Sequence, residues 1–196
     1  EGHRAIAVDL SDIASIEPMV DQAAEGQGLW GLVHCAGGGS IVPLRTLSTN
    51  VLESHMQVNL YAFIELVRQM TKKKRLNPAG GSIIGISSFA STQGEQGQTA
   101  YSAAKAALDA AVHTLSYELA PKGVRINSIR PGMVQTEATD KYLRDMGEER
   151  FNELVHRQLL GLGKPTDVAN LCAFLLSEEG RFMTGRSVYL DGGRFM

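Results

Sequence analysis

The sequence predicts an α/β protein in which a parallel sheet carries helices on both faces. Short apolar runs alternate along the chain with longer segments of helical periodicity, the pattern of repeated strand–helix units. These runs are apolar without clean alternation, as expected for strands that are covered on both faces. With 196 residues and no internal repeat, low-complexity tract or linker, residues 1–196 are predicted to form a single domain.

The individual elements follow from these patterns. The predicted strands are residues 4–10, 30–36, 82–87, 124–130 and 187–191. The predicted helices are residues 49–70, 101–119 and 166–177. Ser48 or Thr49 precedes the first helix, and Pro165 starts the third, where its missing N–H costs no hydrogen bond. Residues 134–163 are helix-prone but more polar.

Composition and charge exclude several function classes. The formal net charge is -2, and no basic stripe offsets it, which argues against a nucleic-acid surface. The one basic cluster, residues 72–75, lies at the end of a predicted helix, where cations favour the helix dipole, so we interpret it as a solvated helix end. Cys35 and Cys172 lie in apolar contexts that suit a reducing cytosol. No apolar run reaches the ~18 residues of a membrane span and no signal peptide is visible, so we expect a cytoplasmic protein without a membrane segment.

Ser88, Tyr101 and Lys105 are the strongest candidates for catalysis. Ser88 follows a predicted strand, and ligands bind at the carboxyl ends of strands in open α/β sheets. The next residues are rich in Gly, Gln, Ser and Thr, which predicts an exposed loop. Tyr101 and Lys105 then share one face of a helix, although neighbours at i and i+4 alone need no catalytic purpose.

This arrangement suits proton transfer to or from a carbonyl oxygen. Ketone reduction needs a proton donor and alcohol oxidation needs a base, and a tyrosine with a pKa of ~10 is a poor base at neutral pH. A nearby ammonium group favours the phenolate, and lowering the pKa by about three units requires about 4 kcal/mol. Ser88 can hydrogen-bond the substrate oxygen without adding a charge.

Ser88, 101-YSAAK-105 and 131-PGMVQT-136 together resemble the short-chain dehydrogenase/reductase family, in its Tyr-Lys branch. Asn59 and the segments 9–12, 34–37 and 184–193 match the family in the same chain order. The best-matching subgroup is the 3-oxoacyl-carrier-protein reductase type. The resemblance implies a Rossmann-like doubly wound sheet, NAD or NADP as cofactor, a small-molecule carbonyl or alcohol substrate, and a homodimer or homotetramer. The apolar faces of the first two predicted helices are either oligomer surfaces or core.

The resemblance also implies roles for individual residues. Tyr101 would be the general acid/base, Ser88 would orient the substrate oxygen, and Lys105 would hold the ribose hydroxyls and bias Tyr101 toward phenolate. Asn59 would hold a water that links Lys105 to solvent. The implied cofactor-binding residues are Asp9, Leu10, Cys35, Ala36, Gly37, Tyr101, Lys105, Pro131, Gly132, Val134 and Thr136, with Asp9 beside the adenine and Thr136 at the nicotinamide carboxamide. No metal is implied.

Two departures from the family pattern stand out. His34 and Cys35 replace the asparagines of the family's Asn-Asn-Ala-Gly turn. Since a thiol hydrogen-bonds only weakly, we expect a loss of bracing there and neither a nucleophile nor a metal ligand. The glycines at 37–39 suit close backbone approach to the cofactor.

The second departure is the missing beginning of the family's fold, a strand, a glycine-rich turn, a helix and a second strand. Residues 37–42 and 161–166 complete neither a dinucleotide nor a P-loop pattern. We therefore expect a sheet without the first two β-α units, in which 4–10 has no neighbour and 30–36 is an exposed edge. The chain also begins without Met, so we expect an omitted or truncated N-terminal portion.

These observations leave two function hypotheses. The first is an NAD(P)-dependent oxidoreductase acting on a ketone or secondary alcohol. The second is a truncated, cofactor-incompetent chain that keeps the catalytic residues without activity. A serine hydrolase is disfavoured because 85-GISSF-89 lacks the closing glycine of a G-x-S-x-G turn. Substrate choice is expected to depend on residues 137–162.

Overall fold

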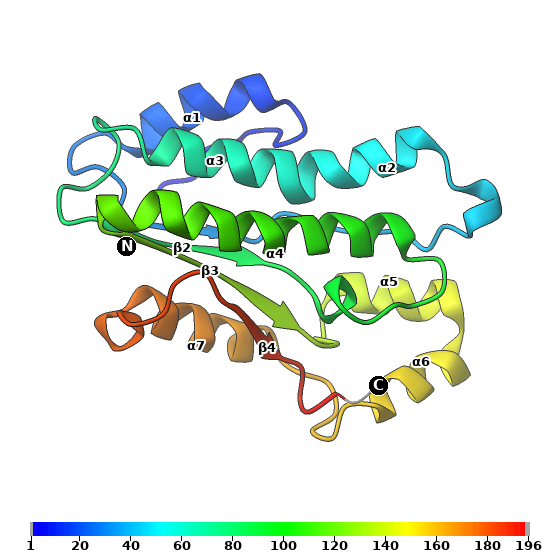
Figure 1. Ribbon diagram of the computed structural model, residues 1–196. Helices are drawn as coiled ribbons and strands as arrows, with labels where there is room; N and C mark the ends of the chain where they lie inside the picture. Colours follow the sequence, from blue (N-terminus) through cyan, green and yellow to red (C-terminus); the bar gives the residue numbers. More distant parts are fainter. Residues whose placement is uncertain (1, 195–196) are drawn as a thin grey trace.

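A parallel sheet lies between two layers of helices in the computed structural model, which describes residues 2–194 (Figure 1). The four strands stand side by side in chain order, β1-β2-β3-β4, and every neighbouring pair is parallel. The strands are β1 (Gly31–His34), β2 (Gly81–Ile86), β3 (Val124–Pro131) and β4 (Ser187–Leu190). The predicted α/β fold class is confirmed, with four of the five predicted strands in place.

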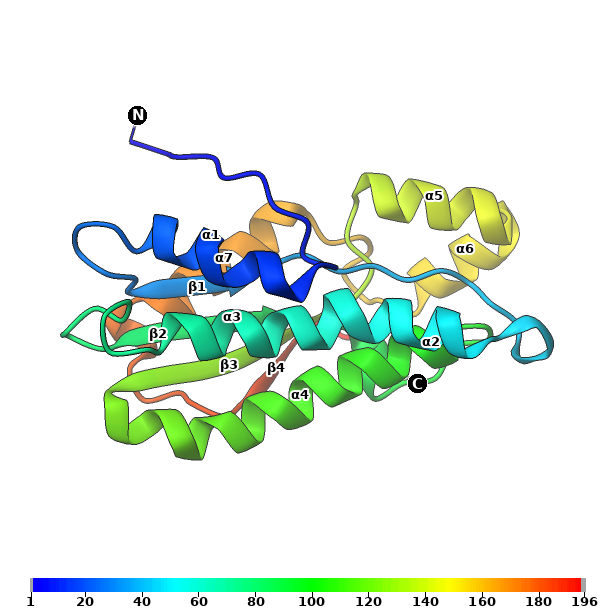
Figure 2. The ribbon, with the colours of Figure 1, turned by 90° about the horizontal axis from the view of Figure 1, so that it is seen from above.

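Helices cover both faces of the sheet, as a doubly wound fold requires (Figures 1 and 2). The helices α2, α3 and α4 lie on one face with α1 outside α3, and α7 covers the opposite face. The helices are α1 (Ile16–Ala23), α2 (Thr49–Met56), α3 (Ala62–Met70), α4 (Thr99–Leu119), α5 (Glu137–Met146), α6 (Glu148–His156) and α7 (Pro165–Leu176). A π-helical turn, Gln57–Tyr61, joins α2 to α3, so the first predicted helix is confirmed but interrupted.

Local sequence sets the beginnings of these helices. Ser48 is extended, and its hydroxyl accepts a hydrogen bond from the N–H of Val51 (3.4 Å), which caps α2. Pro165 occupies the first turn of α7, as predicted. The carboxylate of Asp167 accepts a hydrogen bond from the N–H of Lys164 (2.7 Å) at the same end, so both helix starts satisfy otherwise unpaired donors.

The core lies on both faces of β2 and β3. Ile83 and Ile126 pack against α3 and α4, whereas Ile84 and Ile129 pack against α7, and all four are 0% exposed. Successive side chains on a strand point to opposite faces, which explains why the central strands are apolar without alternation. The apolar faces of the first two predicted helices, expected to be either oligomer surfaces or core, lie mainly in the core. Their buried residues are Leu60, Phe63, Val67, Met70, Leu108 and Leu119.

The predicted strand at residues 4–10 is wrong. Residues 2–9 have no regular secondary structure, and their side chains are mostly exposed. No strand precedes β1 within residues 2–194, so this segment has no neighbour to accept and donate its backbone hydrogen bonds. As expected, β1 is the edge of the sheet.

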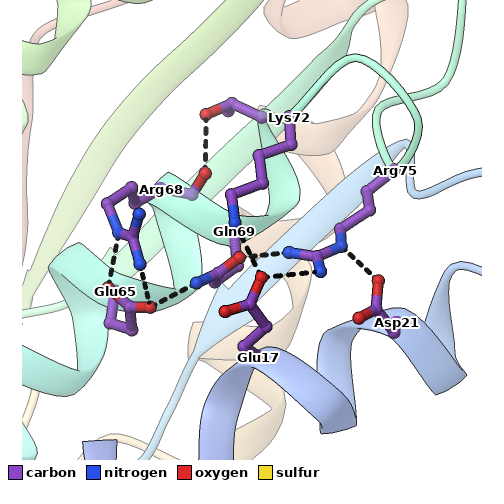
Figure 3. Close-up of polar contacts among 8 residues, drawn as sticks. Glu17, Asp21, Glu65, Arg68, Gln69, Lys72 and Arg75 are labelled. Atoms are coloured by element: carbon purple, nitrogen blue, oxygen red, sulfur yellow. Dashed lines mark hydrogen bonds and ion pairs between the residues drawn. The ribbon is translucent and has the colours of Figure 1, made fainter. Parts of the chain in front are cut away.

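The helix α1 was not predicted, and a cluster of charges joins it to the segment that follows α3 (Figure 3). Arg75 donates to Asp21 (2.5 Å) and Glu17 (3.1 Å) of α1, and also to Gln69. Lys72 pairs with Glu17 (2.7 Å), which together with Arg75 lowers the pKa of Glu17 to about 2. Arg75 is buried, so the interpretation of residues 72–75 as a solvated helix end was wrong for Arg75, whereas Lys73 and Lys74 are exposed.

Candidate active site

A cavity of about 530 Å³ opens at the carboxyl ends of β1, β2 and β3. This is the edge of the sheet at which open α/β proteins bind ligands. One wall of the cavity is the glycine loop 37–39 with Tyr101 and Lys105 of α4. Ser88, Phe89 and the turn from Pro131 to Val134 also line the cavity, and α7 supplies further apolar lining.

The candidate catalytic side chains meet in this cavity because β2 ends where α4 begins. Ser88 follows β2 directly, and its hydroxyl accepts a hydrogen bond from the N–H of Ala90 (3.1 Å). Tyr101 lies in the first turn of α4 and Lys105 one turn later. The ammonium of Lys105 donates to the carbonyl of Ile86 (2.7 Å) and lies 5.7 Å from the centre of the Tyr101 ring. The fold therefore gathers a hydroxyl, a phenol and an ammonium group around one space.

Burial pushes Tyr101 and Lys105 toward their neutral forms. Burial raises the pKa of Tyr101, and its hydrogen bond with Ser88 acts in the opposite direction. Burial lowers the pKa of Lys105 to about 8, against the favourable charge of Asp109. The expected bias of Tyr101 toward phenolate is thus opposite to the direction in the structure, because desolvation of the ring outweighs its polar neighbours. A neutral phenol is the form that can donate a proton.

Asn59 lies behind the glycine loop and does not line the cavity. It belongs to the π-helical turn, a feature that is frequent at functional sites, and is 1% exposed. Its amide N–H groups donate to the carbonyls of Gly38 (3.1 Å) and His55 (2.8 Å). Its Oδ1 is buried and has no hydrogen-bond partner among residues 2–194.

The glycine loop packs against the catalytic candidates at distances that only glycine permits. A Cβ on Gly37 would lie 2.5 Å from Oδ1 of Asn59 and 3.0 Å from Nζ of Lys105. A Cβ on Gly39 would lie 2.7 Å from the Tyr101 ring. Residues 37 and 39 therefore have no room for a side chain. The sequence suggested close approach to a cofactor as the reason for these glycines, whereas the near neighbours in the structure are side chains of the protein itself.

His34 supplies bracing that Cys35 does not. The His34 ring lies 3.1 Å from the carbonyl of Val58 through Nε2 and packs on Phe63. Burial lowers the pKa of His34 to about 4, so the ring is neutral near pH 7 and Nε2–H donates to Val58. Cys35 lines the cavity, and its desolvation raises the pKa of its thiol, which disfavours a nucleophilic thiolate.

The predicted cofactor-binding residues divide into two groups. Those that line the cavity are Cys35, Gly37, Tyr101, Lys105, Pro131, Gly132, Val134 and Thr136. Ala36 lies within the same turn but not on the cavity surface, and Asp9 and Leu10 lie away from it. Asp9 accepts hydrogen bonds from the N–H (2.9 Å) and hydroxyl (2.7 Å) of Ser11, and Leu10 packs against the α1–α3 cluster. The roles assigned to these residues stay predictions.

Comparison with known proteins agrees with this geometry. A family model described as Enoyl-(Acyl carrier protein) reductase matches residues 1–194. The chain is 32% identical over 190 residues to the 3-oxoacyl-[acyl-carrier-protein] reductase FabG of Rickettsia felis, covering 96% of this chain and 77% of that protein. A crystal structure of a short-chain dehydrogenase/reductase from Brucella melitensis superposes with a TM-score of 0.88 at 30% identity, covering 98% of this chain and 76% of that one. The chain belongs to the short-chain dehydrogenase/reductase family.

Two further proteins are similar to this short-chain dehydrogenase/reductase. A blue fluorescent protein from a metagenomic library, solved in complex with NADPH, has a TM-score of 0.86 and 31% identity, covering 96% of this chain and 74% of that one. The FabG of Rickettsia conorii is 37% identical over 142 residues, which cover 72% of this chain and 57% of that protein.

Sequence reasoning missed several cavity residues of this family member. The lining residues outside the segments singled out for the cofactor or the substrate are Ser40, Ile86, Ser87, Phe89, Gln98, Met133, Pro165, Val168, Ala169 and Cys172. Gln158 of the α6–α7 connection was also missed; it is buried and donates to the carbonyls of Met133 (3.2 Å) and Gly161 (2.6 Å). Most of these residues lie far in sequence from Ser88 and Tyr101, so no local pattern marks them. The position of Phe89 and Gln98 inside the predicted loop was the one available signal.

Three absences hold for the described part of the chain. Within residues 2–194, no cluster of three or more His, Cys, Asp or Glu side chains is arranged to hold a metal ion. None of the described helices combines the length and the hydrophobicity that a bilayer span requires. No strand followed by a glycine-rich turn occurs before β1 in this part of the chain.

Proposed function

We propose that this protein is an NAD(P)-dependent oxidoreductase that reduces a ketone or oxidises a secondary alcohol, with Tyr101 as the general acid/base. The observation that supports this most is the meeting of Ser88, Tyr101 and Lys105 in one cavity at the carboxyl edge of the sheet. Family membership supports the same reaction class. A small molecule of the carbonyl or alcohol class is the partner, and a homodimer or homotetramer remains part of the proposal.

The residues present fit the nicotinamide end of such a cofactor. The glycine loop leaves open space where a side chain at position 38 would meet nothing within 4 Å, and Asn59 offers a buried unpaired oxygen behind it. Cys35, Gly37 and the turn from Pro131 to Thr136 would hold the group against this edge. When bound, the nicotinamide supplies or accepts the hydride. A relative with 31% identity was solved with NADPH, so NADPH is the first cofactor to test.

In the reducing direction, the protein's own groups handle the proton. The hydroxyl of Ser88 hydrogen-bonds the carbonyl oxygen and orients it toward Tyr101. The Tyr101 phenol donates its proton to the oxygen as negative charge develops there, and its raised pKa keeps it protonated beforehand. Lys105, held by the carbonyl of Ile86, stabilises the phenolate that results.

A 3-oxoacyl thioester is the first substrate to test. The FabG of Rickettsia felis is a 3-oxoacyl-[acyl-carrier-protein] reductase by name. The cavity lining is largely apolar around its polar centre, with Phe89, Met133 and Val168 among the residues that an acyl chain would contact.

Replacement of Tyr101 tests the proposal. We expect Tyr101→Phe to lower turnover of acetoacetyl-CoA with NADPH by at least about a hundredfold, because general acid–base catalysis contributes about that much. The dissociation constant for NADPH, followed by nicotinamide fluorescence, should stay unchanged. Tyr117→Phe is the matched control, since Tyr117 lies on the same helix and is 72% exposed.

Two results would contradict the proposal. Retained turnover in Tyr101→Phe would exclude Tyr101 as the acid/base. Failure of the chain to bind either NADPH or NADH in the fluorescence titration would favour the alternative, a chain that keeps these side chains without cofactor binding or activity.

A further inference from the structure

The loop between Ser88 and α4 forms part of the cavity but belongs to no strand. Its first residue, Phe89, lines the cavity directly beside Ser88 and is 6% exposed. A short 3-10 helix, Phe89–Ser91, is followed by residues 92–98 without regular hydrogen bonding to the sheet. Side chains from distant segments must therefore determine where this loop lies.

Arg194 makes the largest set of contacts with this loop. Its guanidinium carbon lies 4.1 Å from the centre of the Phe89 ring. Its Nη2 pairs with Glu95 (2.8 Å), its Nε donates to Gln93 (3.2 Å), and its Nη1 donates to the carbonyl of Leu154 in α6 (3.0 Å). One side chain thus joins three positions of the loop to the helix that closes the same end of the molecule.

The route of the chain explains how Arg194 reaches this position. After β4, Gly192 and Gly193 take φ values of 62° and 73°, a left-handed conformation that favours glycine. These two residues turn the backbone back toward the loop, and Arg194 follows. Tyr189 of β4 also contacts this loop, because its hydroxyl lies 2.7 Å from the hydroxyl of Thr92.

The buried charge of Arg194 is fully compensated only when the loop has the observed arrangement. The side chain is 1% exposed, so its charge has lost nearly all contact with water. A buried charge is tolerated when a partner and further hydrogen bonds surround it, and a planar guanidinium meets that need only from fixed directions. Movement of Phe89, Gln93 or Glu95 would remove part of this compensation, which couples the loop to Arg194.

We propose that Arg194 is a positioning residue that fixes Phe89 beside Ser88 and thereby sets the affinity for the carbonyl substrate. It reaches neither Tyr101 nor the glycine loop, so it acts through Phe89 and leaves proton transfer unchanged. The proposal rests on the proposed oxidoreductase function for its kinetic part. Its structural part, the ordering of residues 89–98 by Arg194, stands independently of catalysis.

The test compares Arg194→Met with Arg157→Met. Methionine keeps much of the length and the apolar contact with Phe89 but removes all three polar contacts. Arg157 is the matched control, because it also approaches Glu95 (3.5 Å) but has a side chain that is 48% exposed. With acetoacetyl-CoA and NADPH, we expect KM for acetoacetyl-CoA to rise about tenfold in Arg194→Met, the effect of one lost charge-assisted hydrogen bond. Neither kcat nor the NADPH dissociation constant should change, and Arg157→Met should resemble the wild type.

Hydrogen exchange provides the readout that needs no activity. Amides of residues 89–98 should exchange about tenfold faster in Arg194→Met than in Arg157→Met, while those of β2 and α4 should keep their rates. Faster exchange throughout the chain would show a general structural role and overturn the proposal. Equal loop exchange in the two variants would also overturn it.

Two further variants keep the test decisive if Arg194→Met folds poorly. Arg194→Lys keeps the charge for Glu95 but lacks the planar group that bonds Gln93 and Leu154, so it should show a smaller change in the same direction. Arg194→Met with Glu95→Gln also removes the carboxylate charge that would otherwise keep only the longer contact with Arg157, and it should recover folding but not KM. If the wild type fails to turn over any probe while loop exchange still responds to Arg194, the proposed function fails and the positioning role stands.

Discussion

The glycine wall of the cavity, residues 37–39 with Tyr101 and Lys105, is held by close backbone packing, whereas the outer wall, Phe89 and Met133, is held by long side chains. In the glycine wall the decisive feature is close packing of the backbone. A Cβ added at Gly37 or Gly39 would lie within 3.0 Å of Asn59, Lys105 or Tyr101. In the outer wall they are the hydrogen bonds of Arg194 and Gln158.

This difference has a consequence for how each wall tolerates change. Backbone packing leaves few alternative positions, which suits groups that must transfer a proton over a short, defined distance. Long side chains can be exchanged without moving a strand or a helix, which suits a wall that meets the variable part of a substrate. Under the proposed function, Tyr101 and Lys105 lie in the closely packed glycine wall, whereas Phe89 and Met133 would contact the variable part of a substrate.

Gly39→Ala should show the largest effect, because it places a methyl group against the Tyr101 ring. We expect turnover to fall by about a hundredfold, the cost of displacing a catalytic group by about 1 Å. Steady-state rates with acetoacetyl-CoA and NADPH measure it. Gly94→Ala is the control, since a Cβ there meets nothing within 4 Å and Gly94 does not line the cavity. Equal activities in the two variants would show that the glycine wall is not held by this packing.

The lowered pKa of Lys105 makes the free energy of unfolding of the protein depend on pH. Its pKa is lowered from 10.5 to about 8 in the folded protein, so between these values the unfolded chain binds a proton that the folded chain does not. Lys105 should therefore make the free energy of unfolding rise with pH, by about 2 to 3 kcal/mol between pH 8 and 10, whereas the raised thiol pKa of Cys172 acts in the opposite direction above pH 9. Below pH 8 the folded and unfolded chains both bind the proton, so Lys105 no longer makes the free energy of unfolding change with pH.

Urea unfolding across this pH range measures the effect. The rise should disappear in Lys105→Met and persist in Lys74→Met, which changes an exposed lysine outside the site. A slope that Lys105→Met leaves intact would mean that another group titrates.

Gln158→Leu should have the smallest of these effects and should act on the outer wall alone. It removes the hydrogen bonds to Met133 and Gly161 and leaves the buried N–H of Met133 without its acceptor. We expect a loss of about 2 kcal/mol in the free energy of unfolding, the cost of such an unsatisfied group. Gln135→Leu, at an exposed position of the same turn, should cost less than about 0.5 kcal/mol. If both variants have the same stability, Gln158 does not hold this wall.

Several features of the molecule follow from its sequence alone. The four strands that exist, the helices α2 to α4 and α7, and the edge position of β1 all carry local patterns of apolar spacing and capping residues. Ser88, Tyr101 and Lys105 became candidates because a strand end, a polar loop and a helix start occur in order, and the resemblance to family motifs along the chain assigned them as a site. Patterns of this kind are local, so the sequence records them directly.

Tertiary structure decided what local patterns cannot record. Residues 4–10 have the composition of a strand but no neighbour to pair with, and Arg75 ends a basic run yet is buried against α1. Burial raises the pKa of Tyr101, where its charged neighbour alone predicted a lower value. Arg194 contacts Phe89 and Gln158 contacts Met133 across 105 and 25 positions of the chain, only because the fold brings them together. Strand pairing, burial and long-range contacts depend on which segments become neighbours in space. Local patterns in the sequence predicted the helices and strands but not which of their side chains would come into contact.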